Sequence, residues 1–306
     1  MGFELNRRGF DPEDVQRDGL GRVALVTGAN SGIGRAASLD LLRRGFDVWM
    51  LCRDLGRGSE ARDAMARECG EGRVHLAVVD ISSLRSIRRL AEALPLEQVD
   101  VLVHNAGVLP RDKQLTEDGV ELTFATNVLG PFALTGLLMD RLARSSDARV
   151  IFVASGGLYL QRFDLSLIEV PASRFHGPRV YANAKRGQVI LAGMLAERFS
   201  DDAPVTFASM HPGWVDTTAL RTSLPGFYGV MRPILRTAEQ GADTVVWLAT
   251  SDVPRGTRGQ LWFDRRVACQ HPLPWTRERG ETRKRLLAQC ELLSHVSLSE
   301  PHRKAA

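Results

Sequence analysis

The chain has 306 residues, of which 44% are hydrophobic and 25% are charged, and its formal net charge is +4 at pH 7. This length suits one α/β domain, and no stretch approaches the roughly 18 apolar residues that a membrane helix needs. The first twenty residues lack a signal peptide's apolar segment, and the four cysteines lack metal-ligand spacing, so we expect a cytoplasmic protein with ordinary thiols. The positive residues are mostly scattered among acids, which argues against a nucleic-acid partner.

Short apolar segments alternate with helical segments along the chain, which predicts an α/β fold. We expect strands near residues 22–27, 47–52, 74–79, 99–104, 149–154, 205–210 and 260–263. They would form a doubly wound, mostly parallel seven-stranded sheet with helices on both faces, a Rossmann fold. Residues 1–20 and 270–306 are interpreted as extensions of one domain over residues 21–269. The second extension is expected to be partly helical, with a basic solvated face for which a role at a membrane surface stays open.

A glycine-rich turn, Thr27-Gly28-Ala29-Asn30-Ser31-Gly32-Ile33-Gly34, follows the first expected strand and precedes a helical pattern. The glycines let backbone N–H groups approach phosphates, and the positive end of the following helix favours negative charge. The spacing differs from G-x-G-x-x-G, because four positions separate Gly28 from Gly32 and two separate Gly32 from Gly34. The sequence predicts a pyrophosphate cradle here, with a plain strand-to-helix turn as the alternative.

Tyr181 and Lys185 are four residues apart in a helical pattern and share one helix face. A free tyrosine has a pKa near ~10, and an ammonium ~5 Å away would lower it by roughly two units at an effective dielectric of ~20. The pair therefore predicts a phenol that acts as a general acid or base. Two unrelated surface residues are the alternative, since such a pair alone is weak evidence.

These and other motifs resemble, in chain order, the short-chain dehydrogenase/reductases. They are the turn at 27–34, His104-Asn105-Ala106-Gly107, Asn127, Ser155, Tyr181 with Lys185, and Pro212-Gly213-Trp214-Val215-Asp216-Thr217. The resemblance covers roughly residues 21–264, and stretches such as Met210-His211-Pro212-Gly213-Trp214 are similar to the branch called dehydrogenase/reductase family member twelve. It implies an NAD(P)-binding catalytic domain and an oxidoreductase that acts on CH–OH or C=O groups.

The charge after the second strand indicates which cofactor is preferred. Arg53 lies 19 residues after Gly34, where an acid would hold the ribose hydroxyls of NAD and an arginine would accept the 2′-phosphate of NADP. Cys52 stands where the acid would be expected, so we predict NADP(H) in preference to NAD(H), with an arginine on a loop surface as the alternative.

The resemblance implies an ordered set of cofactor contacts. They are Thr27, Gly28, Asn30, Ser31, Gly32, Ile33 and Gly34 in the first turn, then Arg53, Asp80, Ile81, Asn105, Ala106, Gly107, Tyr181, Lys185, Pro212, Gly213, Val215 and Thr217. His104 stands where the family usually has asparagine, and we expect it to be a packed, hydrogen-bonded residue.

The resemblance also implies a catalytic tetrad of Asn127, Ser155, Tyr181 and Lys185. Tyr181 would give its proton to a carbonyl oxygen as hydride arrives from the nicotinamide, and Lys185 would lower the pKa of Tyr181 while holding the nicotinamide ribose. Ser155 would hydrogen-bond the same oxygen, and Asn127 would hold a water that links Lys185 to solvent. Taken singly, Ser155 is equally a strand-end cap and Asn127 a satisfied helix residue.

The interval from Ser155 to Tyr181 is 26 residues, about twice that of shorter family members. This loop and the segment after Thr217 are rich in apolar side chains, which favours a lipophilic aldehyde, ketone or alcohol as substrate. The residues are Leu158, Tyr159, Leu160, Phe163, Leu165, Leu167, Ile168 and Phe175, followed by Leu220, Leu224, Phe227, Tyr228 and Met231. The alternative is that they pack against one another.

Two other classes of function stay open at this point: an NADP-binding regulator without turnover, and a scaffold that binds partners through its extensions. The intact tetrad argues against the regulator. A homodimer or homotetramer that pairs through the helices of Asn127 and Tyr181 is also open, unless the extensions cover those faces.

Overall fold

The computed structural model describes residues 2–11, 14, 18–199, 203–223, 225–255, 257 and 259–298. Over these residues an eight-stranded sheet has the order β3-β2-β1-β4-β5-β6-β7-β8. The strands are β1 (Val23–Thr27), β2 (Asp47–Cys52), β3 (Val74–Val78), β4 (Val101–His104), β5 (Ala148–Val153), β6 (Val205–Met210), β7 (Leu261–Phe263) and β8 (Arg266–Val267). The expected doubly wound α/β class is confirmed, but the expected count of seven strands is one short. The eighth, β8, is two residues long and antiparallel to β7, too short to leave an apolar pattern.

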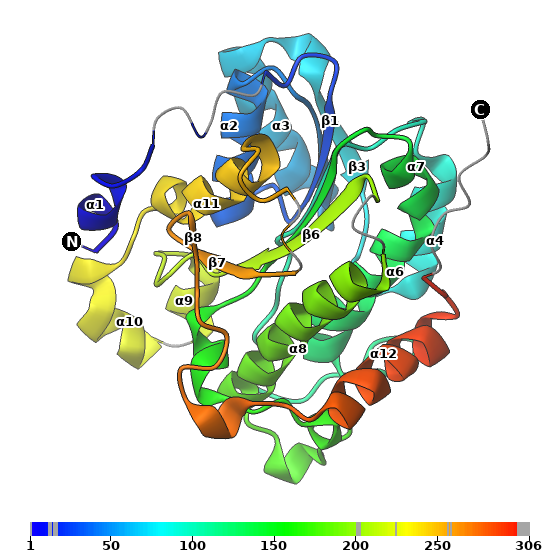
Figure 1. Ribbon diagram of the computed structural model, residues 1–306, viewed down its shortest axis with the longest axis vertical. Helices are drawn as coiled ribbons and strands as arrows, with labels where there is room; N and C mark the ends of the chain where they lie inside the picture. Colours follow the sequence, from blue (N-terminus) through cyan, green and yellow to red (C-terminus); the bar gives the residue numbers. More distant parts are fainter. Residues whose placement is uncertain are drawn as a thin grey trace.

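Helices cover both faces of the sheet (Figure 1). They are α1 (Gly2–Arg7), α2 (Gly32–Arg43), α3 (Leu55–Cys69), α4 (Leu84–Ala93), α5 (Leu122–Phe124), the π-helical turn η3 (Ala125–Leu129), α6 (Gly130–Leu137), α7 (Met139–Ala143), α8 (Gly177–Arg198), α9 (Thr218–Ser223), α10 (Pro225–Met231), α11 (Ala238–Thr250) and α12 (Gly280–Ser294). Short 3₁₀ turns are η2 (Glu71–Arg73), η4 (Gly156–Leu160), η5 (Leu165–Ile168), η6 (Ala172–Arg174), η7 (Arg232–Ile234) and η8 (Pro274–Thr276). Among the described helices, none is long and apolar enough to cross a membrane.

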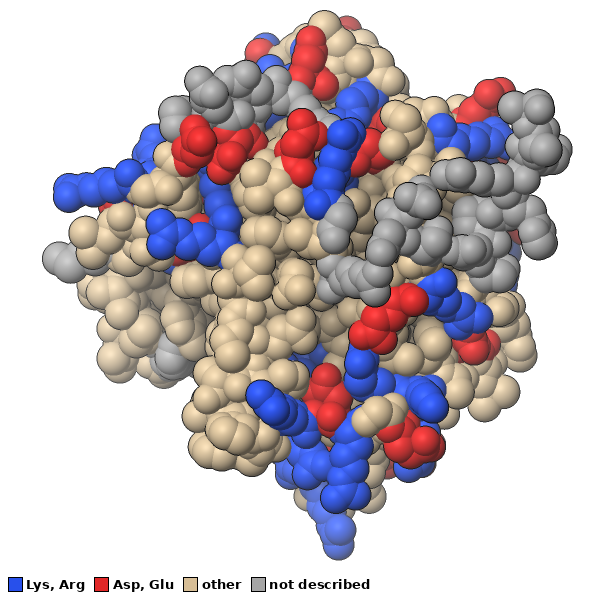
Figure 2. Space-filling view, viewed as in Figure 1, with Lys and Arg blue, Asp and Glu red and all other residues tan. Residues whose placement is uncertain are grey.

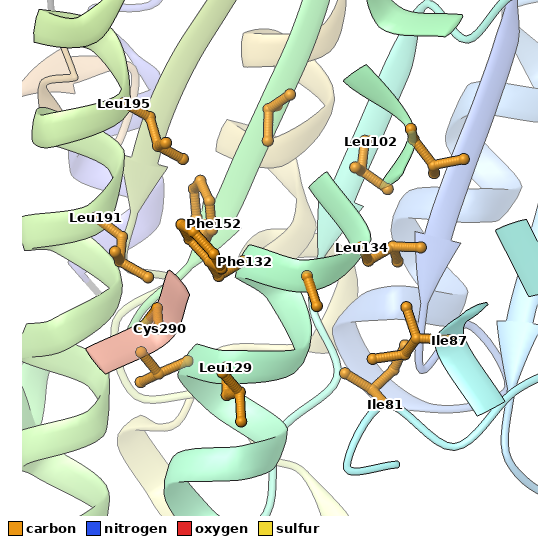
Figure 3. Packing of buried hydrophobic residues seen from close by; sticks show 14 of the residues in the cluster. Ile81, Ile87, Leu102, Leu129, Phe132, Leu134, Phe152, Leu191, Leu195 and Cys290 are labelled. Atoms are coloured by element: carbon orange, nitrogen blue, oxygen red, sulfur yellow. The ribbon is translucent and has the colours of Figure 1, made fainter. Parts of the chain in front are cut away.

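Alternate residues of each strand feed two separate cores. In β1, Ala24 and Val26 join the core beneath α2, α3 and α11, whereas Leu25 joins the core beneath α4, α6 and α8. Figure 3 shows the second core, in which Phe132 of α6 and Phe152 of β5 are packed together. Each such buried side chain contributes about 1.5–3 kcal/mol to stability, so the two cores hold the carboxyl ends of the strands in a fixed arrangement.

The C-terminal helix α12 packs along α8 and extends the second core (Figure 1). Leu286 and Cys290 of α12 are fully buried on the side that faces the core, while Arg283 of α12 pairs with Glu197 of α8 at 2.8 Å. Part of α8, one of the two helices through which pairing of subunits is expected, is therefore covered. Figure 2 shows acidic and basic side chains intermingled on this face, with Lys and Arg gathered at its lower end.

Candidate active site

The carboxyl ends of β1 to β6 border a cavity of about 690 Å³, the place where open parallel sheets bind ligands. Most of the residues expected to bind cofactor or act in catalysis line this cavity. They are Gly28, Asn30, Ser31, Gly32, Ile33, Arg53, Asp80, Ile81, Asn105, Ala106, Gly107, Ser155, Tyr181, Lys185, Pro212, Gly213, Val215 and Thr217. Thr27, Gly34 and Asn127 lie behind the wall rather than on it.

The glycine turn has the shape of a phosphate cradle. Gly28 and Gly32 have φ of +66° and +53°, a conformation that favours glycine. A Cβ on Gly34 would lie 2.5 Å from the Gly28 carbonyl oxygen, so only glycine lets α2 approach the turn. Ser31 precedes α2 without a side-chain capping bond, which leaves the first N–H groups of the helix available to an anion.

Thr27 joins the ends of β1 and β4. Its Oγ1 accepts hydrogen bonds from the backbone N–H groups of Asn105 and Ala106, both at 2.9 Å, and donates to the Val103 carbonyl at 3.2 Å. The Asn105 amide in turn donates to the Thr27 carbonyl at 2.9 Å. Thr27 therefore builds the cradle, and the residues around it present backbone groups to the cavity.

Arg53 stands exposed at the rim where β2 ends. Cys52 before it is buried, and burial raises the pKa of its thiol, so this position offers no anion to ribose hydroxyls. The Asp54 carboxylate caps α3 by accepting the Arg57 N–H at 2.8 Å. Among the described residues no carboxylate pairs with Arg53. Its guanidinium is therefore available to bind a ligand.

Ser155, Tyr181 and Lys185 converge on the cavity from two elements. Ser155 follows β5, and Tyr181 and Lys185 project from successive turns of α8. The Ser155 Oγ accepts a hydrogen bond from the Gly157 N–H at 3.4 Å, and Ser155 lines the cavity together with Tyr181. The Lys185 Nζ donates to the Val153 carbonyl oxygen at 2.8 Å and lies 5.6 Å from the centre of the Tyr181 ring. The expected grouping of these three side chains is thus present.

The pKa of Tyr181 differs from the expectation. Burial raises the pKa of this phenol to about 12, and the neighbouring Ser155 side chain offsets only part of that effect. Burial also lowers the pKa of Lys185 to about 7. The net rise differs from the lowered pKa that the spacing of Tyr181 and Lys185 predicts, because removing a phenol from water disfavours its charged form. A lowering effect of Lys185 on Tyr181 stays a prediction. Tyr181 keeps part of its surface open to the cavity.

Asn127 lies in the π-helical turn η3, fully buried beside Gly107. Such turns are often found at functional sites. Its Nδ2 donates to the Thr123 carbonyl at 2.8 Å, while its Oδ1 has no partner among the described residues. A Cβ on Gly107 would lie 2.7 Å from this Oδ1 and 3.4 Å from the Lys185 Nζ. An unpaired buried acceptor thus lies near the ammonium, where a bridging water would satisfy both.

His104 is a buried structural residue, as expected. Its Nε2 lies 2.8 Å from the Thr135 Oγ1, and Thr135 donates its own hydrogen to the Pro131 carbonyl at 2.8 Å. His104 must therefore donate from Nε2 and is neutral. Burial lowers its pKa to about 3.

The apolar loop contributes less to the cavity than the sequence indicates. Leu160 and Leu220 line it, but Leu158, Phe163, Leu167 and Ile168 are buried in the protein core. Leu224 lies outside the described residues, and the Phe227 side chain is not described. Sequence reasoning missed further lining residues, among them Leu109, His176, Arg179 and Trp214. Of these, Trp214 stands inside a recognised motif.

Comparisons with known proteins agree with this geometry. The short chain dehydrogenase family profile matches residues 22–226. Dehydrogenase/reductase SDR family member 12 of Bos taurus is 38% identical over 297 residues, covering 96% of this chain and 92% of that protein. Retinol dehydrogenase 14 of Homo sapiens is 34% identical over 280 residues, covering 84% of this chain and 81% of that protein.

A short chain dehydrogenase from Shigella flexneri, crystallised with NADP, shares the fold with a TM-score of 0.66 at 21% identity, covering 82% of this chain and 100% of its own. The chain belongs to the short-chain dehydrogenase/reductase family, in the member 12 branch, and is an oxidoreductase of CH–OH or C=O groups.

Proposed function

We propose that residues 21–269 form the catalytic domain of an NADP(H)-dependent oxidoreductase that interconverts a lipophilic carbonyl compound and its alcohol. The observation that carries this proposal is the convergence of Ser155 and Tyr181 on the cavity wall, with the Lys185 Nζ 5.6 Å from the centre of the Tyr181 ring. The glycine cradle and the free Asn127 Oδ1 fit a bound dinucleotide and its ordered water.

A bound nicotinamide would supply the hydride in the reducing direction and accept it in the oxidising direction. In the reducing direction, Tyr181 donates its phenolic proton to the carbonyl oxygen while the carbonyl carbon gains hydride, which yields the alcohol. A pKa near 12 keeps this phenol protonated at neutral pH, the state that a proton donor requires. The Ser155 hydroxyl orients the same oxygen and stabilises its developing charge. Lys185 and a water on Asn127 would return a proton to the phenolate.

Arg53 carries the preference for NADP(H). An exposed guanidinium at the end of β2 offers forked donors that suit a 2′-phosphate, and Arg57 lines the same rim. The buried Cys52 thiol cannot replace the acid that binds ribose hydroxyls. The Shigella flexneri structure, which holds NADP, is consistent with this choice.

The substrate end of the cavity favours a lipophilic compound. Leu109, Leu160, Trp214 and Leu220 line it, and Leu160 is 77% exposed at the mouth. Apolar walls with a few polar groups suit an aldehyde, ketone or alcohol with an extended apolar part. The similarity to retinol dehydrogenase 14 supports the same class.

The test is turnover of a matched carbonyl panel with NADPH, and of the corresponding alcohols with NADP⁺, followed by absorbance at the reduced nicotinamide band. We expect turnover of apolar aldehydes or ketones. If NADPH binds and no carbonyl or alcohol is converted, the proposal fails and the regulator becomes the better description.

A further inference from the structure

The Pro212-Gly213 turn after β6, which we assign to the nicotinamide end of the cofactor, is held by Arg236, a residue just before α11. The Arg236 N–H donates to the Trp214 carbonyl at 2.8 Å, and the Asp216 N–H donates to the Arg236 carbonyl at 2.9 Å. The Arg236 side chain then folds back over the turn, where its Nη1 is 3.4 Å from the Pro212 carbonyl oxygen. Arg236 therefore contacts the turn with both its backbone and its side chain.

Gly213 shows how close this contact is. Its φ is +74°, and a Cβ built there would lie 2.8 Å from the Arg236 Nε. Since real Cβ atoms essentially never approach this closely, any other residue would push the guanidinium away. The glycine is required by the arginine as well as by the backbone conformation.

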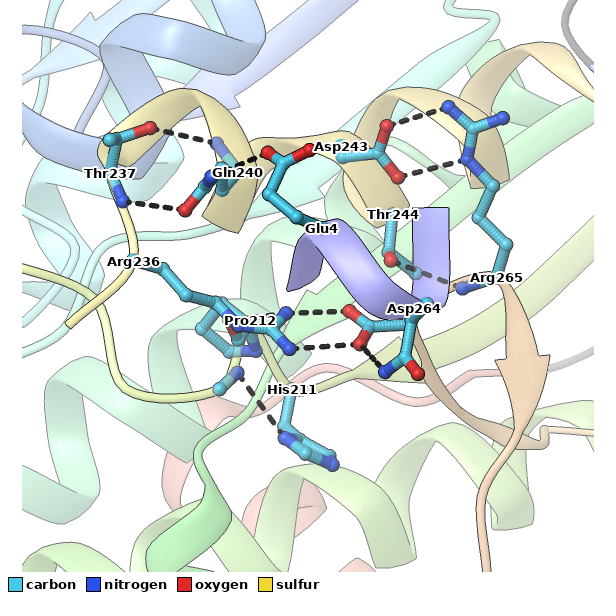
Figure 4. Close-up of polar contacts among 12 residues, drawn as sticks. Glu4, His211, Pro212, Arg236, Thr237, Gln240, Asp243, Thr244, Asp264 and Arg265 are labelled. Atoms are coloured by element: carbon cyan, nitrogen blue, oxygen red, sulfur yellow. Dashed lines mark hydrogen bonds and ion pairs between the residues drawn. The ribbon is translucent and has the colours of Figure 1, made fainter. Parts of the chain in front are cut away.

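Asp264 fixes the Arg236 guanidinium in a two-pronged ion pair. Nη1 lies 2.5 Å from Oδ1 and Nη2 lies 2.8 Å from Oδ2, and the two side chains are only 11% and 4% exposed (Figure 4). Two parallel charge-assisted bonds of this kind fix direction as well as distance. The pair thus joins the turn after β6 to the turn between β7 and β8.

The turn between β7 and β8 has a strained backbone. Asp264 and Arg265 have φ of +47° and +59°, a region that non-glycine residues occupy at a cost. Each is held by an ion pair, Asp264 with Arg236 and Arg265 with Asp243 at 2.6 Å. Such strain persists only where the surroundings fix it, and here it aims the Asp264 carboxylate at Arg236.

The N-terminal helix α1 covers this ion pair. Asn6 Nδ2 donates to the Asp264 Oδ2 at 2.6 Å, and the Phe3 ring, 6% exposed, lies 5.3 Å from the Arg236 guanidinium carbon. Glu4 accepts a hydrogen bond from Gln240 at 3.0 Å (Figure 4). The extension before β1 therefore shields the pair from water, which strengthens its electrostatic attraction.

We propose that Arg236 is a positioning residue for the nicotinamide half of the cofactor, and that Asp264 and α1 hold it in place. This rests on the proposed function, since it assumes that the Pro212-Gly213 turn meets the nicotinamide. The adenosine half would be held by Arg53, whereas Arg236 contacts the turn assigned to the nicotinamide half. Loss of the ion pair should therefore weaken contacts to one half of the cofactor only.

The experiment compares NADPH with adenosine 2′,5′-bisphosphate, which carries the adenosine half and no nicotinamide. In full-length Arg236→Gln, we expect NADPH affinity to fall about tenfold or more, while the bisphosphate affinity changes less than about twofold. The control is Arg283→Gln, which removes the ion pair with Glu197 of α8, away from this turn, and should leave both affinities unchanged. Fluorescence titration measures NADPH binding, and calorimetry measures bisphosphate binding.

A second variant, Phe3→Ala with Asn6→Ala, tests the same idea without touching Arg236 and decides it if Arg236→Gln does not fold. We expect a smaller but equally selective loss of NADPH affinity. The proposal would be overturned by unchanged NADPH affinity in both variants, by a parallel loss of affinity for both ligands, or by the same selective loss in Arg283→Gln. If the unmutated protein binds NADH as tightly as NADPH, the cofactor preference fails instead, and the same comparison with NADH and AMP still tests Arg236.

Discussion

The Lys185 ammonium donates a 2.8 Å hydrogen bond to the carbonyl oxygen of Val153, the last residue of β5. This bond fixes the cation at the strand end that also leads to Ser155. The backbone of the sheet thereby sets the position of the Lys185 ammonium relative to Tyr181.

Tyr181→Phe removes the proposed proton donor and little else. Turnover of an accepted carbonyl should fall by about 10²–10⁴-fold, the usual value of general acid–base catalysis, while NADPH affinity stays within about twofold. Steady-state kinetics and fluorescence titration measure the two effects. Tyr228→Phe is the control, since that phenol contacts Asp216 and is not among the described cavity-lining residues. Substantial activity in Tyr181→Phe would place the proton donor elsewhere.

Arg53→Ala should remove most of the preference for NADPH over NADH. A charge-assisted contact to phosphate is worth about 1.5–3 kcal/mol, so NADPH affinity should fall roughly 10- to 100-fold while NADH affinity changes little. Arg62→Ala is the control, because Arg62 is an exposed arginine of α3 that pairs with Asp63. Equal affinities for NADPH and NADH in the unmutated protein would refute the assignment.

Gly107→Ala should damage the site while leaving the fold intact. The added Cβ would lie 2.7 Å from the Asn127 Oδ1, so it displaces the amide and any water between Asn127 and Lys185. We expect kcat to fall by about tenfold or more, with a loss of about 1–3 kcal/mol in the free energy of unfolding. Gly157→Ala is the matched control on the same cavity, since its Cβ would meet nothing nearer than 3.8 Å. A normal kcat in Gly107→Ala would mean that the Asn127 amide has no part in turnover.

Substrate chain length should raise kcat/KM. Each methylene buried against Leu160 and Leu220 adds ~0.8 kcal/mol of binding, or about fourfold, along a series of unbranched aldehydes until the cavity is filled. Leu160→Asp should flatten this dependence, and Leu292→Asp, a control at an exposed leucine of α12, should not. The preference is disproved if small hydroxy acids or sugars are converted faster than apolar aldehydes.

His104 should make the protein sensitive to acid. Its pKa is about 3 in the fold against 6.5 ordinarily, so the unfolded chain binds the extra proton as pH falls below 6.5. At pH 4.5 this costs about 3 kcal/mol in the free energy of unfolding, and none above about pH 7.5. Urea unfolding at pH 8 and 4.5 should therefore show a smaller difference in His104→Asn. His211, whose pKa burial lowers to about 4, retains some acid sensitivity in the variant. An unchanged difference would show that His104 does not contribute.

Local patterns in the sequence determined the elements and the order of the site. The glycine turn, the strand ends and the four-residue spacing of Tyr181 and Lys185 each depend on a few neighbouring residues. In a parallel sheet the carboxyl ends of the strands meet at one edge, so the order of the motifs also implied a shared cavity. This is why the tetrad and the cradle could be named before their positions were known.

Tertiary structure alone decided the rest, because it depends on contacts between distant segments. The free energy of removing Tyr181 and Lys185 from water depends on everything packed around them, so their spacing could not give their pKa values. An apolar side chain such as Phe163 is compatible with a substrate wall or a core, and only the packing of the loop on α8 decided for the core. The contacts of Phe3 and Asn6 with Arg236 and Asp264 span more than 200 positions, beyond the reach of any local pattern.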